Sequence, residues 1–93
     1  MREWIKRLHA AKPGTERARV RLEYVIAQPD KARLNIVNGV IGAADTLSRA
    51  DDLQLYGNDA LRLLREAMAP DAPEMALQVV AKRALDLLNK GGE

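Results

Sequence analysis

Two structures are possible for residues 32–49, which read ARLNIVNGVIGAADTLSR. The Asn38-Gly39 pair is the dipeptide most typical of a tight β-hairpin turn. On a helical wheel, however, the apolar side chains of the same stretch fall within one arc of about 200°. That arc consists of Ala32, Leu34, Ile36, Val37, Val40, Ile41, Ala43, Ala44 and Leu47. Because this pattern persists over about five turns, we favour a helix and expect no strand pairing across residues 34–43.

The predicted helix contains two glycines, Gly39 and Gly42, each of which costs about 1 kcal/mol relative to alanine in a helix interior. Both fall on the polar side of the wheel, so we expect them to face solvent. The close approach of another helix or of a ligand is the alternative. Asp30 is the expected N-cap residue of this helix.

Four further segments space their apolar residues as helices do and are separated by Pro and Gly. We expect Thr15 to cap the second helix of the chain, Asn58 or Asp59 to cap the fourth after a connection over residues 51–58, and an Asp71–Glu74 capping box to begin the last. The chain is therefore predicted to be a single all-α domain, a compact bundle of four to five short helices at about 2–11, 16–28, 31–49, 59–69 and 73–89.

Residues 16–28 leave a second possibility open. Several apolar residues alternate with charged ones as in a half-buried strand, namely Val20, Leu22, Tyr24 and Ile26. A strand at residues 19–27 within an α+β fold is therefore the alternative. We favour the helix, which places apolar side chains on two sides and so requires neighbours on both.

The composition offers little for catalysis. The 93 residues include no Cys and a single His, which excludes disulfides, thiol nucleophiles and zinc ribbons. We expect His9 to face solvent, and Ser48 has no neighbouring His with which to build a triad. The acidic residues near positions 51–59 lack the ligand alternation of a calcium loop. We therefore expect no enzyme, no metal site and no cofactor.

We expect neither a membrane span nor a secretory signal in this chain. Its longest uncharged stretch, residues 34–44, is well short of the roughly 20 apolar residues that a bilayer span requires. Charged residues interrupt the apolar ones throughout residues 1–12, unlike the apolar region of a signal peptide. We expect a cytoplasmic protein.

Positive charge is concentrated in the first third of the chain. Residues 1–33 hold nine Lys and Arg against four Asp and Glu, whereas the net charge of the whole chain is +2. Arg17, Arg19, Arg21 and Arg33 are therefore candidates for a nucleic-acid contact. We favour a solvated helix face instead, because no aromatic residues are interleaved with these arginines as in a stacking platform.

The N-terminal helix carries Trp4, Ile5 and Leu8 on one face beside several cations, which is typical of a helix at a membrane surface. We prefer docking onto the protein's own core and keep a membrane contact as the alternative. A wide apolar arc on residues 32–49 predicts an exposed apolar surface and hence an interface.

From these features we expect a small protein-interaction or regulatory module that binds a macromolecular partner through an exposed apolar helix surface and forms a homodimer. A nucleic-acid-binding regulator and a membrane-tethered regulator are the alternatives. The residues expected to bind the partner are Trp4, Ile5, Leu8, Arg17, Arg19, Arg21 and Tyr24.

Overall fold

Asn38 and Gly39 lie in the middle of a helix and form no hairpin turn. The computed structural model describes residues 3–72 and 76–91, and within these ranges it contains five helices and no strand. The helices are α1 (Glu3–Ala10), α2 (Thr15–Ala27), α3 (Arg33–Ser48), α4 (Leu55–Ala67) and α5 (Leu77–Gly91). The predicted all-α bundle is confirmed, and α2 occupies the segment for which a strand was the alternative.

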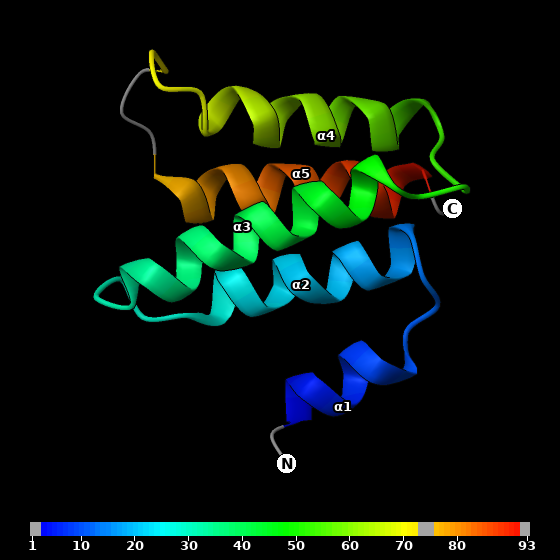
Figure 1. Cartoon of the computed structure of the whole chain (residues 1–93), viewed down its shortest axis with the longest axis horizontal. Helices are drawn as coiled ribbons and strands as arrows, with labels where there is room; N and C mark the ends of the chain where they lie inside the picture. Colours follow the sequence, from blue (N-terminus) through cyan, green and yellow to red (C-terminus); the bar gives the residue numbers. More distant parts are fainter. Residues whose placement is uncertain (1–2, 73–75, 92–93) are drawn as a thin grey trace.

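Helices α2 to α5 form the bundle, and α1 lies outside it (Figure 1). In the bundle α2 packs against α3 and α5, while α4 packs against α5 and, less extensively, against α3. Helix α1 packs against α2, at the opposite edge of the molecule from α4. None of the helices in the described ranges combines the length and the apolar character needed to cross a bilayer.

The core consists of aliphatic side chains from the four bundle helices. Small alanines at helix contacts allow the backbones to approach. From α3 it takes Ile36, Val40, Ala43, Ala44 and Leu47, which is only part of the predicted apolar arc. The largest fully buried side chains are Leu22, Val25, Val40, Leu47, Leu64, Val80 and Leu88.

Gly39 faces α2, and the expectation that both glycines of α3 face solvent is wrong at this position. A Cβ on Gly39 would overlap Cγ2 of Val25 and would lie 3.7 Å from Cδ1 of Tyr24. The missing side chain therefore allows α2 and α3 to pack closely. Gly42 borders a long side chain instead, since a Cβ there would lie 3.0 Å from Nη1 of Arg21.

Helix α4 begins at Leu55, so the predicted start at residue 59 is wrong and neither Asn58 nor Asp59 caps it. The reason is the burial of Gly57, at which a Cβ would overlap Cδ1 of Leu53. This packing draws the glycine into the first turn of the helix, where turn propensity alone would place it in a loop. The amide of Asn58 accordingly donates to the carbonyl oxygen of Gln54 at 2.9 Å.

Both ends of α2 are stabilised by side chains distant in the sequence. The N-cap position is Gly14 and Thr15 is the first residue of the helix, so the prediction that Thr15 caps α2 is wrong. The backbone N and the Oγ1 of Thr15 instead both donate to Oδ1 of Asp52, each at 3.1 Å. At the other end, Nε2 of Gln78 donates to the carbonyl oxygens of Val25 at 3.0 Å and Gln28 at 2.6 Å. These bonds satisfy groups that a helix end leaves unpaired.

The caps predicted for the other helices differ from those observed. The N-cap position of α3 is Ala32, without a side-chain hydrogen bond, so the prediction that Asp30 caps this helix is wrong. The capping box predicted at residues 71–74 extends beyond the described residues, and α5 begins at Leu77.

Candidate interaction surface

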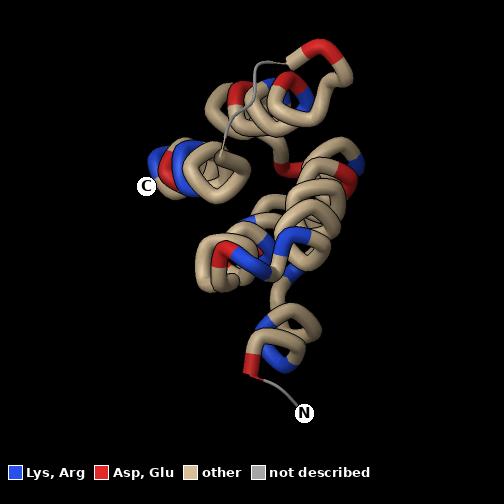
Figure 2. The backbone as a smooth tube through the Cα atoms, turned by 90° about the vertical axis from the view of Figure 1, so that its left-hand side faces the viewer, with Lys and Arg blue, Asp and Glu red and all other residues tan. Residues whose placement is uncertain are grey.

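Helix α1 is held to α2 by one aromatic contact and one ion pair. The rings of Trp4 and Tyr24 lie with their centroids 4.1 Å apart and their planes tilted by 33°. Arg7 pairs with Glu23 beside them. Ile5 and Leu8 are partly covered, but α1 contributes no fully buried residue. The second view also shows α1 apart from the other helices (Figure 2), so α1 is peripheral to the core.

A groove lies between α1 and α3 above the surface of α2. At one end it is a hollow of about 190 Å³. A second hollow, which is lined by α1 and α2, shares Arg21 with it, and we treat the two together. We call this the α1–α3 groove, and its lining residues are Trp4, Leu8, His9, Arg17, Arg21, Tyr24, Asn35, Asn38 and Gly39.

The charge of the α1–α3 groove is positive. Arg17 and Arg21 are one turn apart on α2, and none of the residues lining the groove is acidic. Nη2 of Arg17 donates to the carbonyl oxygen of Ala11 at 3.1 Å. Within the described residues, by contrast, Arg21 forms no ion pair. Like charges one turn apart repel, so the groove favours a negatively charged occupant.

Helix α2 can present this groove because it has neighbours on two sides, as its sequence predicts. Ala18, Leu22 and Val25 point into the bundle core. Val20 and Tyr24 line the contact with α1. The arginines at positions 17 and 21 lie between these two apolar sides and are partly covered.

The outer face of α3 carries an exposed apolar stripe. Leu34 is 72% exposed and Ile41 50% exposed, while Val37 is partly covered. Asn38 lies one turn from both Leu34 and Ile41 and also lines the groove, so the two features adjoin. We call Leu34, Val37, Asn38 and Ile41 the α3 stripe.

The four arginines considered for nucleic-acid contact do not converge. Arg17 and Arg21 line the groove, Arg19 faces a different hollow near α5, and Arg33 lies beside the start of α5. Lys and Arg are likewise spread over several helices in Figure 2. Such a distribution differs from the single basic face that nucleic-acid binders usually have.

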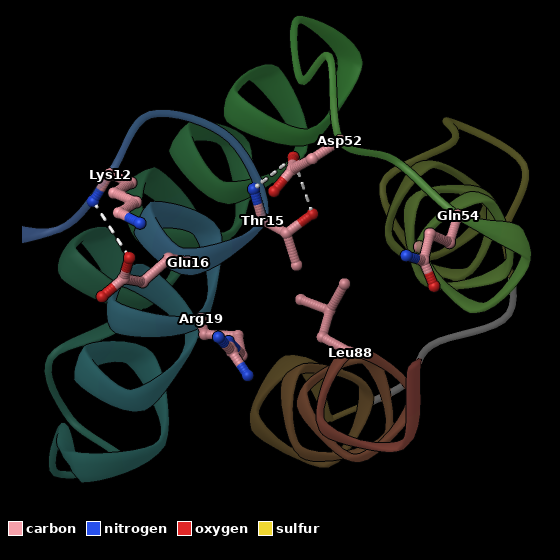
Figure 3. A pocket seen from close by; sticks show the side chains of 8 residues that line it. Lys12, Thr15, Glu16, Arg19, Asp52, Gln54 and Leu88 are labelled. Atoms are coloured by element: carbon pink, nitrogen blue, oxygen red, sulfur yellow. Dashed lines mark hydrogen bonds between the residues drawn. The ribbon is translucent and has the colours of Figure 1, made fainter. Parts of the chain in front are cut away.

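The hollow that contains Arg19 has a volume of about 230 Å³ and joins the start of α2 to the loop before α4 (Figure 3). Its polar groups bond largely to one another. Asp52 accepts the two bonds from Thr15, and the backbone N of Lys12 donates to Oε2 of Glu16 at 3.2 Å. These internal bonds indicate a structural role for this hollow.

Ser48 and His9, the residues considered for catalysis, lie on different helices and share no hollow among those described. Oγ of Ser48 donates to the carbonyl oxygen of Asp45 at 2.8 Å, whereas His9 lies on α1 and lines the groove. Across residues 3–72 and 76–91, no group of His, Cys, Asp and Glu is placed to hold a metal ion.

Of the seven residues predicted to bind a partner, five line the α1–α3 groove: Trp4, Leu8, Arg17, Arg21 and Tyr24. Ile5 lies on α1, and Arg19 belongs to the other hollow. Sequence reasoning missed Asn35 and Asn38, because both fall on the polar side of the wheel. The one sequence feature that could have indicated them is their position one turn and one residue before Gly39, where the close approach of another helix was the alternative prediction.

Comparison of this chain with protein-family models, with curated proteins and with solved structures gives no match. The α1–α3 groove and the α3 stripe are therefore the features of this chain that bear on its function.

Proposed function

We propose that this protein is a small, non-enzymatic interaction module that self-associates through the α3 stripe. The observation that supports this proposal is the exposure of Leu34 (72%) and Ile41 (50%) on one face of one helix. Large apolar side chains grouped on a surface are typical of interfaces. The occupant that fits the stripe best is the same stripe of a second copy.

An antiparallel pair of α3 helices matches the stripe to itself. Leu34 and Ile41 are separated by about two turns. With a twofold axis beside Asn38, Leu34 of each copy therefore meets Ile41 of the other, as a self-complementary interface requires.

Charge complementarity supports the same arrangement. Asp45 is exposed on the outer face of α3, where it also pairs with Arg49 of the same helix. The antiparallel pairing brings it within about one turn of the first residues of the other copy's α3. That helix start has no side-chain cap, and a carboxylate near a helix N-terminus is favourable.

The size of the stripe predicts a weak dimer. Burying a Leu or Ile side chain is worth roughly 2 kcal/mol, so the exposed parts of Leu34 and Ile41 contribute roughly 5 kcal/mol over two copies. Val37 and Asp45 add to this value, whereas the loss of free motion on association reduces it. The expected dissociation constant is on the order of 0.1–1 mM.

Sedimentation equilibrium from about 20 μM to about 1 mM tests the proposal, because this range spans the expected dissociation constant. The apparent mass of the unmodified protein should rise above the monomer's 10.3 kDa as concentration increases. The Leu34→Lys variant should remain at the monomer mass, since the charge would be buried against the second copy.

Leu55→Lys is the matched control, because Leu55 is 73% exposed and lies on α4. This variant should associate as the unmodified protein does, and far-UV circular dichroism should show all three proteins to be equally helical. A constant monomer mass for the unmodified protein up to about 1 mM would rule the proposal out. So would an equal loss of association in the two lysine variants.

A further inference from the structure

A second binding site, which adjoins the α3 stripe at Asn38, is indicated by the unpaired charge of the α1–α3 groove. Three other arginines of the described part pair with acids: Arg7 with Glu23, Arg49 with Asp45 and Arg62 with Asp59. Arg17, Arg19 and Arg21 have no such partner there, although each is partly covered, and Arg17 and Arg21 share one hollow. Glu23, which lies beside the groove's aromatic pair, is already engaged by Arg7.

The buried donors without a partner gather at the same place. Among the described residues, the buried side-chain nitrogens that lack an acceptor are Nε1 of Trp4, Nε of Arg17 and Nε of Arg21. All three residues line the groove. Buried donors are nearly always paired in folded proteins, so the groove lacks acceptor atoms. An acceptor can reach these covered nitrogens if α1, which has no buried residue, shifts slightly.

The space beside Arg21 is kept open by α3. Gly42 presents no side chain where the guanidinium lies, since a Cβ there would be 3.0 Å from Nη1. Gly39 forms part of the wall of the 190 Å³ hollow, together with the amide side chains of Asn35 and Asn38. The aromatic pair Trp4 and Tyr24 forms an apolar wall on the other side.

We propose that the α1–α3 groove binds the carboxylate side chains of an acidic peptide segment. A carboxylate supplies two acceptor oxygens in the geometry that a guanidinium binds best. The methylene groups of a glutamate can pack on the aromatic wall, and Asn38 can donate from its amide. A nucleic acid fits less well for two reasons. Arg19 and Arg33 lie elsewhere and cannot contact the same phosphates. The rings of Trp4 and Tyr24 pack on each other instead of offering free faces to bases.

Trp4 is the only tryptophan of the chain, so its fluorescence reports on this groove directly. An end-blocked peptide of eight glutamates, added up to about 1 mM to protein at about 5 μM, should change the emission saturably. At this protein concentration the dimer proposed above is negligible, so the measurement is independent of self-association. Raising the salt concentration should weaken binding, since the attraction is between charges.

Arg21→Gln should raise the half-saturation concentration by at least about tenfold, because a charged hydrogen-bonded pair is lost. Arg19→Gln is the matched control, an arginine of the same helix that faces the other hollow, and it should bind as the unmodified protein does. Arg21→Lys should recover part of the affinity, as a point charge without the planar guanidinium.

A second measurement does not depend on any variant being folded. Heteronuclear NMR of the unmodified protein should show peptide-induced shifts at the Trp4 indole and at the Asn35 and Asn38 side-chain amides. The proposal is overturned if no saturable change occurs, if the shifts lie elsewhere, or if Arg19→Gln weakens binding as much as Arg21→Gln. It is also overturned if a single-stranded oligonucleotide of equal charge binds more tightly than the glutamate peptide.

Discussion

Replacing Gly39 by alanine brings two opposite effects into competition. In an ordinary helix interior, Gly→Ala raises stability by about 1 kcal/mol. At Gly39, however, the new Cβ would overlap Cγ2 of Val25, whose side chain is fully buried. Overpacking of this kind costs about 1–3 kcal/mol. We therefore expect Gly39→Ala to lower the free energy of unfolding by up to about 2 kcal/mol.

Gly42→Ala is the matched control, because it makes the same change in the same helix. Its Cβ would meet Nη1 of Arg21 at 3.0 Å, and the end of a long side chain can move away. This variant should gain about 0.5–1 kcal/mol from helix propensity. Urea unfolding followed by circular dichroism measures both variants. Their free energies of unfolding should differ by about 0.5–3 kcal/mol, which corresponds to a difference in melting temperature of roughly 2–24 °C.

Overpacking between position 39 and Val25 is refuted if Gly39→Ala is as stable as the unmodified protein or more so. A double variant provides an internal check. In the Val25→Ala background the space for a Cβ at Gly39 exists, so Gly39→Ala should cost less there than in the unmodified protein. A coupling free energy of at least about 0.5 kcal/mol between the two positions is expected.

Three other substitutions test the contacts that hold the helices together. Gln78→Leu should lower the free energy of unfolding in urea by about 1–2 kcal/mol, since it removes the side-chain donor to the carbonyl oxygens of Val25 and Gln28 at the end of α2; an unchanged midpoint would show that solvent replaces the amide. Asp52→Ala should cost about 1 kcal/mol through the lost cap of α2, whereas Asp51→Ala, at the exposed neighbouring position, should have no effect. Trp4→Ala removes the ring contact of α1 and should reduce helical ellipticity while shifting the bundle's stability by no more than about 1.5 kcal/mol; cooperative loss of the whole fold would contradict a peripheral α1.

The sequence was sufficient to predict that each of the five segments is a helix, but several helix boundaries could not be predicted from it. The apolar pattern of residues 32–49 outweighed the Asn38-Gly39 turn signal because it extends along the whole of α3. The start of α4 was missed because Gly57 has a turn propensity in isolation and a packing role in the fold. The local sequence pattern does not show that the Leu53 side chain packs on Gly57.

The helix caps were missed for a related reason. Cap prediction assumes that a helix end is paired by a residue next to it in the chain. In this fold Asp52 and Gln78 pair the ends of α2, at sequence separations of 37 and 50 residues. Neither partner can be identified before the bundle is assembled.

The candidate site was predictable in its residue types and less so in its layout. Trp4, Arg17, Arg21 and Tyr24 share the groove because helical spacing places them on adjoining sides of α1 and α2. Arg19 was grouped with the other arginines by proximity in sequence, yet on a helix it points to a different side. The contribution of Asn35 and Asn38 depends on how closely α3 approaches α2, which is a tertiary property.

The remote pairing of both ends of α2 has a consequence for how the chain opens and closes. Terminal turns of a helix ordinarily fray independently of the rest of a protein. In α2, fraying at Thr15 also requires separation from the loop before α4, and fraying at Val25 requires separation from α5. Backbone amides near both ends should therefore exchange with solvent almost as slowly as those in the middle. The first turn of α2 becomes ordered when the loop before α4 is in place, and the last turn when α5 docks.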